Sequence, residues 1–172
     1  MTDSQLTLKL IGSSISMDIL QEAVSAFTDL LHDATNRLCS PGNDVKWIVD
    51  VLPGSVVVNV IPHSVSIPFP VMFEVVDHLE NGFAAVSQGN VPDFFSDNAL
   101  RHVSRLAALS GPPEKPSGTS IQILRGDKVA DLSVTHSLII NSYLDRQMLY
   151  RDWGSVEGIV TSLSLAKGYH FT

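Results

Sequence analysis

The sequence predicts an α+β fold in which an antiparallel or mixed sheet is covered by a long amphipathic helix and a helix pair. Three patterns lead to this prediction. Residues 5–11 alternate apolar and polar side chains, residues 17–38 repeat apolar side chains every three or four positions, and residues 45–61 are rich in β-branched residues. Periods of two and 3.6 are typical of half-buried strands and amphipathic helices, respectively. With 44% apolar and 17% charged residues, the 172-residue chain has the composition of a protein with a buried core.

The first strand, residues 5–11, ends at Gly12 and leads into the helix predicted over 17–38. Ser16 is placed to cap this helix, and Asp18 is favourable in its first turn. The helix is expected to end at the Pro-Gly pair in residues 40–43. Its inward face is expected to comprise Leu20, Val24, Phe27, Leu31, Ala34 and Leu38.

Residues 45–51 and 55–61 are expected to form a β-hairpin around Pro53-Gly54. Two-residue hairpin loops prefer primed turns, which a Pro-Gly pair does not favour. We therefore expect a longer connection with a bulge at Ser55.

Helical spacing returns in residues 69–110, which predict two helices arranged as an αα-hairpin. The first is expected to end at Gly89-Asn90-Val91-Pro92, and Ser96 is placed to cap the second. Arg101 and Arg105 fall on the outer side of the second helix. The expected inward residues are Met72, Val75, Val76, Leu79 and Phe83 in the first helix, and Leu100, Val103, Leu106 and Ala107 in the second.

Residues 111–118 have the composition of a linker, so the sequence predicts a core domain at 1–110 and a small β-rich unit at 119–172. In this unit we expect a hairpin at 120–133, a helix at 135–149, and strands at 156–163 and 168–172. The last strand stops without a turn, which suggests a truncated unit. The helix is expected to face inward through Ile139, Ile140, Tyr143, Leu144 and Met148.

Charge and cysteine content narrow the functional classes. A net charge of −7 disfavours general nucleic-acid binding, and the lone Cys39 excludes an intramolecular disulfide. No signal-peptide pattern and no run of 18 apolar residues occurs, so we expect a cytoplasmic protein that does not enter membranes. Cys39 lies at a helix C-terminus, where the helix dipole opposes thiolate formation, and is expected to be an inert core residue.

Motifs that would indicate catalysis or cofactor binding are weak. The six histidines are never closer than 15 residues, and Asp77, His78 and Glu80 are expected to lie on a solvated helix face rather than to bind a metal. The sequence therefore predicts no cofactor, metal or catalytic residue. An anion site is one interpretation of the turn formed by Gly12, Ser13 and Ser14, although an ordinary strand-to-helix turn is favoured.

Two basic patches bear on nucleic-acid binding. Arg101, His102 and Arg105 form the smaller patch. The second patch mixes cations with aromatic rings, which can stack on bases. It comprises Arg146, Tyr150, Arg151 and Trp153.

Two resemblances extend these patterns. The order of elements, with Trp47 in the hairpin and Gly154-Ser155-Val156-Glu157-Gly158 near the end, resembles a group of uncharacterised bacterial proteins and implies no activity. The segment 156–160 followed by 169–172 resembles the first two strands of an OB-type barrel. That resemblance implies single-strand binding on stacked aromatics, for which Tyr169, Phe171 and Trp153 are the candidates.

Three functions therefore remain open. The favoured one is a non-enzymatic protein-interaction or regulatory module, which binds a protein partner or forms a homo-oligomer along the hairpin 45–61 or the segment 155–172. The alternative is a nucleic-acid-binding protein that uses the C-terminal patch. The third is a small-ligand binder or enzyme that uses the Gly12–Ser14 turn and the groove between helix and sheet.

Overall fold

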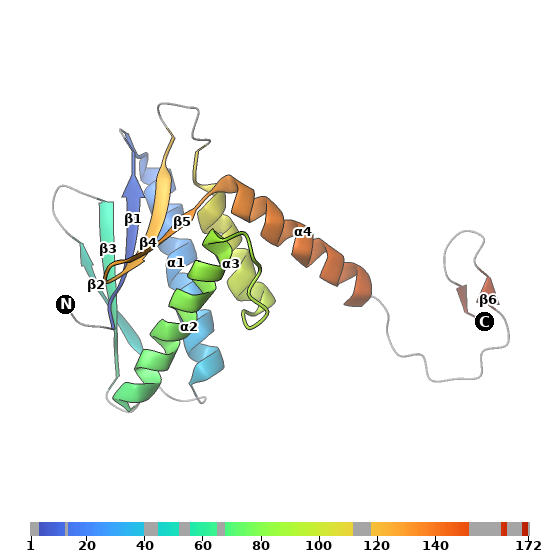
Figure 1. The fold of residues 1–172 in the computed structure, drawn as a ribbon, viewed down its shortest axis with the longest axis horizontal. Coiled ribbons are helices and arrows are strands. Elements are labelled where there is room, and N and C mark those ends of the chain that lie inside the picture. The colour runs from blue at the N-terminus through green and yellow to red at the C-terminus, as the bar shows by residue number, and fades with distance from the viewer. Residues whose placement is uncertain are drawn as a thin grey trace.

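The computed structural model describes residues 4–12, 14–39, 45–51, 56–64, 68–111, 118–151, 163–164 and 170–171. Figure 1 shows the arrangement of the elements. In chain order these are β1 (Leu6–Ile11), α1 (Met17–Leu38), β2 (Lys46–Val51), β3 (Val56–His63), α2 (Phe69–Ser87), α3 (Asp97–Ala108), β4 (Ser120–Arg125), β5 (Lys128–Leu132), α4 (Val134–Arg151), β6 (Leu163–Ser164) and β7 (His170–Phe171).

Five strands form one antiparallel sheet in the order β2-β3-β1-β4-β5. The N-terminal strand β1 occupies the centre: Leu8 pairs with Val58 of β3 on one side and with Ile123 of β4 on the other. The predicted α+β class is confirmed, and the sheet is antiparallel at each of these ladders.

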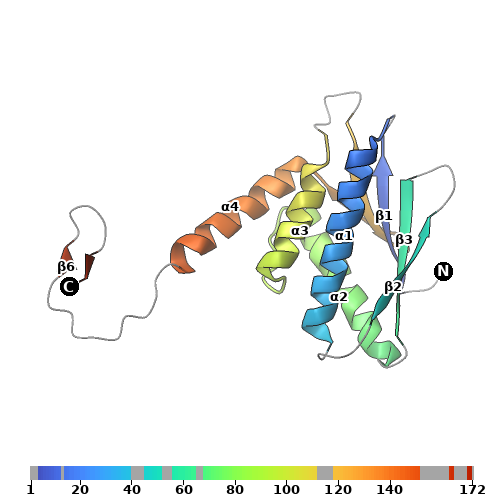
Figure 2. The same cartoon turned by 180° about the vertical axis from the view of Figure 1, so that it is seen from behind.

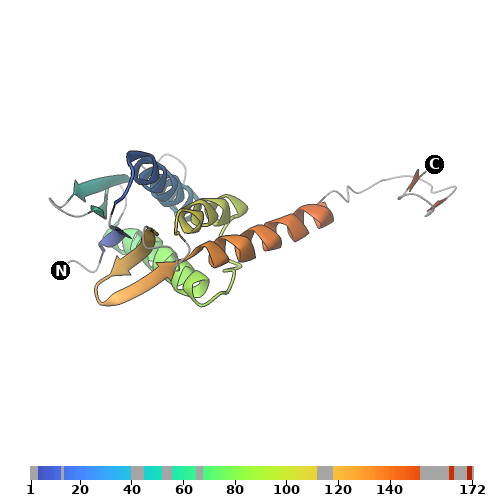
Figure 3. The same cartoon turned by 90° about the horizontal axis from the view of Figure 1, so that it is seen from above.

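The helices cover one face of this sheet, as Figure 2 shows from behind. Alternation places Leu6, Leu8 and Leu10 of β1 on the covered face, where all three are buried. Seen from above, α1 and α2 lie next to the sheet, while α3 and α4 lie further out (Figure 3). The rings of Phe27 on α1 and Phe83 on α2 lie 6.5 Å apart within this core. On the opposite face of the sheet, polar side chains of neighbouring strands contact each other. Thr7 Oγ1 of β1, for example, donates a 2.8 Å hydrogen bond to Asn59 Oδ1 of β3.

The division expected at residues 111–118 does not separate two sheets. β4 and β5 follow that segment in the chain, yet β4 pairs along β1 from Thr7–Leu124 to Ile11–Ser120. The two ends of the segment are also joined, because Gly111 N donates a 2.8 Å hydrogen bond to Thr119 O. The strands on both sides of this segment in the chain therefore belong to one sheet, in which β4 pairs with the side of β1 that β3 leaves open.

The helices match the predicted positions with two differences in packing. Ser16 and Ser96 cap α1 and α3 as expected, and every residue expected to face inward on α2 and α3 is buried. On α1 the prediction that Leu38 faces inward is wrong, because this side chain is 37% exposed. The buried stripe instead includes Ala23, Ala26 and Leu30, because α1 also packs against α3 and α2. The expected αα-hairpin is not a packed helix pair, since α3 packs mainly on α1 and α4 rather than on α2.

Both predicted hairpins form. The last pair of the β2–β3 ladder is Val51–Val58, so its connection is longer than Pro53-Gly54, as predicted, while the bulge expected at Ser55 lies outside the described residues. The β4–β5 hairpin is tighter. Arg125 pairs with Lys128 across two residues, and Gly126 has a φ of 57°, a backbone conformation that favours glycine.

The strand β5 is followed by the helix α4. α4 runs through residue 151 and buries Ile140 and Leu144 as expected, but the prediction that Ile139 faces inward is wrong, because this side chain is 36% exposed. The short strands β6 and β7 pair with each other. Most of the strands expected at 156–163 and 168–172, and with them most of the OB-like pattern, lie outside the described residues.

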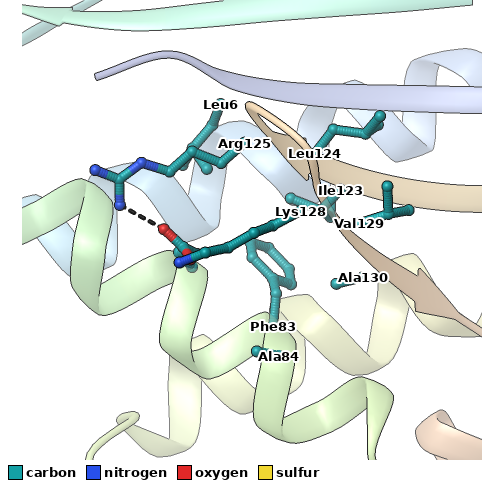
Figure 4. Close-up of a pocket in the computed structure, with 10 residues that line it drawn as sticks. Leu6, Phe83, Ala84, Ile123, Leu124, Arg125, Lys128, Val129 and Ala130 are labelled. Atoms are coloured by element: carbon teal, nitrogen blue, oxygen red, sulfur yellow. Dashed lines mark hydrogen bonds and ion pairs between the residues drawn. The ribbon is translucent and has the colours of Figure 1, made fainter. Parts of the chain in front are cut away.

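Two ion clusters join helices to their neighbours. Arg105 of α3 contacts Glu22 and Asp29 of α1, with N–O distances of 2.8 and 3.0 Å. Arg125 of β4 reaches α2, where it contacts Asp77. It also contacts Glu80 at 2.6 Å, the ion pair that the dashed line from Arg125 marks in Figure 4. The Arg125–Glu80 pair is only 13% exposed on each side, so it is less screened by water than the Arg105 cluster.

Replacing Phe27 with alanine should lower the free energy of unfolding by about 3–5 kcal/mol, because the ring is fully buried between α1, α2 and the sheet. Urea unfolding followed by circular dichroism measures the loss. As a control, Leu138→Ala removes an exposed side chain and should change stability by less than about 1 kcal/mol. A near-neutral Phe27→Ala would show that the core is placed wrongly.

Candidate functional site

The helix α4 is fixed to the body at its N-terminal half. Ser133 N donates a 3.1 Å hydrogen bond to His136 Nδ1 at the helix start. Further along, the buried hydroxyl of Ser104 on α3 lies 2.8 Å from Ser137 Oγ and donates to Asn141 Oδ1 at 2.9 Å. Together with the buried Ile140 and Leu144, these polar contacts set the rotation of α4 about its axis.

This rotation leaves apolar side chains on the outer face of α4. Leu138 is 62% exposed, and Val134 and Ile139 are 37% and 36% exposed. In all three overall views, α4 runs away from the rest of the fold, so its outer face is not covered by another described element (Figures 1–3).

The outer face of α4 forms one side of an apolar groove of about 440 Å³, which we call the α4 groove. Val91, from the connection between α2 and α3, lies at the other side, and Arg146 stands at one end. The lining is formed by Val91, Thr135, Leu138, Ile139, Ser142, Tyr143 and Arg146.

Sequence reasoning missed this groove, although a signal was present. Leu138, Ile139 and Ile140 are consecutive, and three neighbouring residues on a helix point in directions about 100° apart. They cannot all face one core. Such a run therefore predicts either burial on several sides or an apolar surface, and the structure shows the second.

The basic and aromatic residues predicted to bind nucleic acid are not brought together in the described part of the chain. Arg146 is exposed at the end of the α4 groove. Tyr150 and Arg151 belong to the last turn of α4, and Phe171 lies in β7, but the positions of their side chains are outside the description, as are Trp153 and Tyr169.

The smaller basic patch and the open face of the sheet also lack the features of a stacking surface. Arg105 of the Arg101–His102–Arg105 patch is engaged by the carboxylates of Glu22 and Asp29. The described residues on the open face of the sheet include no Phe, Tyr or Trp. Trp47 of β2 points to the covered face, where it contacts Thr35 of α1. Single-stranded nucleic acids are usually held on such rings.

The turn expected to bind an anion joins β1 to α1 at the surface. Gly12 and Ser14 are exposed, while Ser13 is outside the described residues. Ser16 Oγ already accepts a 3.3 Å hydrogen bond from Ile19 N at the helix start. The described geometry of this turn is thus that of an ordinary capped helix N-terminus.

Asp77, His78 and Glu80 do not lie on one solvated face as expected. Glu80 contacts Arg125 and Lys128, whereas His78 packs on the rings of Phe94 and Phe95, with centroid distances of 4.9 and 5.4 Å. The ring of Phe95 fits here because Gly82 on α2 has no side chain; a Cβ there would overlap the ring. Within the described residues no group of three potential metal ligands occurs.

Cys39 is buried, as predicted for an inert thiol. Burial and the negative charge of Glu74 raise the pKa of the Cys39 thiol above its ordinary value. The thiolate, which is the reactive form, is therefore disfavoured.

Comparison with known proteins adds no relative from which a function could be transferred. No family model, no curated protein and no solved structure matches this chain. In the part of the chain that is described, no helix has the length and apolarity required to cross a membrane.

The packing of His78 predicts a pH dependence. Partial burial, together with the positive charge of Arg37, lowers the pKa of His78 below 6.5. The unfolded chain therefore binds a proton at His78 more readily than the folded chain does, so stability is complete above pH 6.5 and falls as the pH drops toward the folded-state pKa.

We expect His78→Gln to flatten this part of the stability profile, measured by urea unfolding between pH 5 and 8. His63→Gln, at the exposed end of β3, is the matched control for removing an imidazole away from the His78 contacts. Equal slopes in the wild-type protein and His78→Gln would refute the assignment.

Proposed function

We propose that this chain is a non-enzymatic protein-interaction module and that the α4 groove is its binding surface. The observation that carries the proposal is the exposure of Val134, Leu138 and Ile139 on one face of a helix whose other face is buried. Contiguous exposed apolar surface with a polar rim is typical of protein-binding sites.

The lining of the groove favours one class of occupant. Residues of α4 and Val91 of the α2–α3 connection offer mainly apolar surface, which suits the apolar face of an amphipathic helix. Arg146 at the end of the groove favours an acidic side chain on the partner. We therefore propose a different protein that contributes an amphipathic helix with an acidic residue near one end.

The fixed position of α4 supports this role. The Ser104–Ser137–Asn141 contacts hold the helix in one rotation, so the groove exists before the partner arrives. A preformed surface avoids part of the ordering cost of association. The lone buried cysteine is consistent with a cytoplasmic location, which we propose for the module.

Substituting Leu138 with glutamate should weaken partner binding at least about tenfold, because a charge would be buried in the apolar groove. The complex is isolated by gentle purification of tagged protein from its own host and weighed by native mass spectrometry. A photocrosslinking residue at position 142, inside the groove, should label the same partner.

Ile48→Glu provides the matched control. Ile48 is 52% exposed on β2, in the hairpin that the sequence favoured as an interface, so it receives the same change on another surface. Retention of the partner by Ile48→Glu and its loss by Leu138→Glu support the α4 groove. The reverse pattern would show that the β2–β3 hairpin is the interface. Crosslinking of two copies of this chain through position 142 would show that the groove binds a second copy rather than a different protein.

A further inference from the structure

The edge strand β2 is the part of the sheet that the described elements leave most open. It stands at one end of the strand order, on the side of the sheet away from α4 (Figure 2). β2 packs mainly on β3, and a hollow of about 330 Å³ lies between α1 and the β2–β3 hairpin beside Trp47. The other edge strand, β5, packs against α2 and leads directly into α4. Of the two edges, that of β2 is therefore the more accessible to a further strand.

The regularity of β2 suits pairing with another strand. Its six residues, Lys46–Val51, include no proline or glycine, and the β2–β3 ladder runs without a bulge from Lys46–His63 to Val51–Val58. Ile48, in the middle of the strand, is 52% exposed. A regular edge strand with an exposed β-branched residue is a template for a neighbouring strand.

The order of charges along β2 selects the strand that would pair with it. Alternation places Lys46, Ile48 and Asp50 at successive positions of the open face, because Trp47 lies on the covered face. A basic, an apolar and an acidic residue in this order are complementary to the same three residues read in the opposite direction. An antiparallel strand of identical sequence therefore matches β2, and a second copy of this chain supplies that strand.

One register gives this match. With Ile48 opposite Ile48 of the second copy, Lys46 lies opposite Asp50 of the second copy, and the two-fold axis repeats this pair of opposite charges on its other side. Moving the axis by one residue, to Trp47 or Val49, would place Ile48 opposite a charged residue instead. The ammonium group of Lys46 has three donors, so it can bind an acidic residue of the second copy in addition to the interaction that Lys46 has within its own chain.

We propose that the chain forms a symmetric homodimer in which β2 pairs antiparallel with β2 of the second copy, centred on Ile48. The two five-stranded sheets then join into one continuous sheet, with the helices of both copies on the same face. The hollow beside Trp47 leaves room on that face next to the junction. This dimer does not depend on the α4 groove, because α4 follows β5 at the opposite end of the strand order.

Sedimentation equilibrium of the full chain tests the dimer and its register. The wild-type chain should dimerise reversibly at concentrations between about 1 and 200 µM. Lys46→Glu places acidic residues opposite each other on both sides of the axis and should weaken dimerisation at least about tenfold; Asp50→Lys should do the same with basic residues. The double variant Lys46→Glu, Asp50→Lys restores both pairs of opposite charge and should recover the affinity to within about threefold.

Circular dichroism shows whether each variant keeps the wild-type fold. A wild-type chain that is monomeric over this range would overturn the proposal. A folded double variant that dimerises as weakly as the single variants would also overturn it, because the opposite-charge register would then be wrong.

The variant Ile48→Cys tests the position of the two-fold axis independently of charge. Opposite residues of antiparallel strands have Cα atoms about 4.5–5.5 Å apart, within the range that a disulfide spans. Oxidation should therefore link Ile48→Cys chains into covalent dimers, whereas the wild-type chain, whose Cys39 is buried, should not be linked. Val129→Cys is the matched control, because Val129 is 49% exposed on the other edge strand. Equal linking of the two variants would contradict the β2 junction.

Two further variants distinguish this dimer from the proposed function. Leu138→Glu alters the α4 groove and should leave the dimerisation constant unchanged. Ile48→Glu places two glutamates opposite each other at the axis, so it should abolish the dimer and still bind the partner of the α4 groove. Loss of the dimer in Leu138→Glu, with retention in Ile48→Glu, would show that copies associate through α4 and would refute the β2 junction.

Discussion

The position of β1 at the centre of the sheet is the constraint on which the other elements depend. β1 is the first element of the chain, yet both of its ladder sides are paired, one with β3 and the other with β4. The two hairpins of the sheet have no ladder with each other and meet only through β1. Since β4 lies more than 100 residues after β1 in the sequence, the five-stranded sheet is complete only when the β4–β5 hairpin has formed and paired with β1.

The one-sided cover of this sheet follows from the alternation in β1 and decides where surfaces remain. Leu6, Leu8 and Leu10 require burial on one face, and α1 and α2 provide it. The two ion clusters then fix the outer elements, with Arg105 tying α3 to α1 and Arg125 tying β4 to α2. α4 follows the last strand of the sheet and, among the described elements, packs mainly on α3, so part of its apolar surface remains exposed. The proposed interaction surface is thus a consequence of the order of the elements.

Much of the fold was predictable because its signals are local. Each of these signals depends on residues close in sequence. They are the helix caps Ser16 and Ser96, the turn at Gly126, and the periodicity of α2 and α3. The pairing of β4 with β1 carries no local signal, and the proline-rich segment 111–118 even suggested a boundary. A loop and a linker have the same composition, so only the long-range ladder distinguishes them.

The candidate sites were less predictable for the same reason. Their residues come from distant segments, as when Val91 meets α4 or Trp47 meets Thr35 of α1. The groove between helix and sheet was anticipated in general terms, but not the residues that line it. The exposure of Ile139 depends on the rotation of α4 about its axis. That rotation is set by a contact between two buried serines, Ser104 on α3 and Ser137 on α4. Neither serine is distinguished in the sequence by a pattern.

Native-state hydrogen exchange of the full chain tests the central role of β1 most directly. If one sheet is built on β1, the amides of β1, β3 and β4, among them Leu8 and Ile123, exchange only through global unfolding and report the same free energy. If the amides of residues 120–132 exchange through an opening of much lower free energy while those of β1 stay protected, the second hairpin is a separate unit. That result would contradict the single sheet.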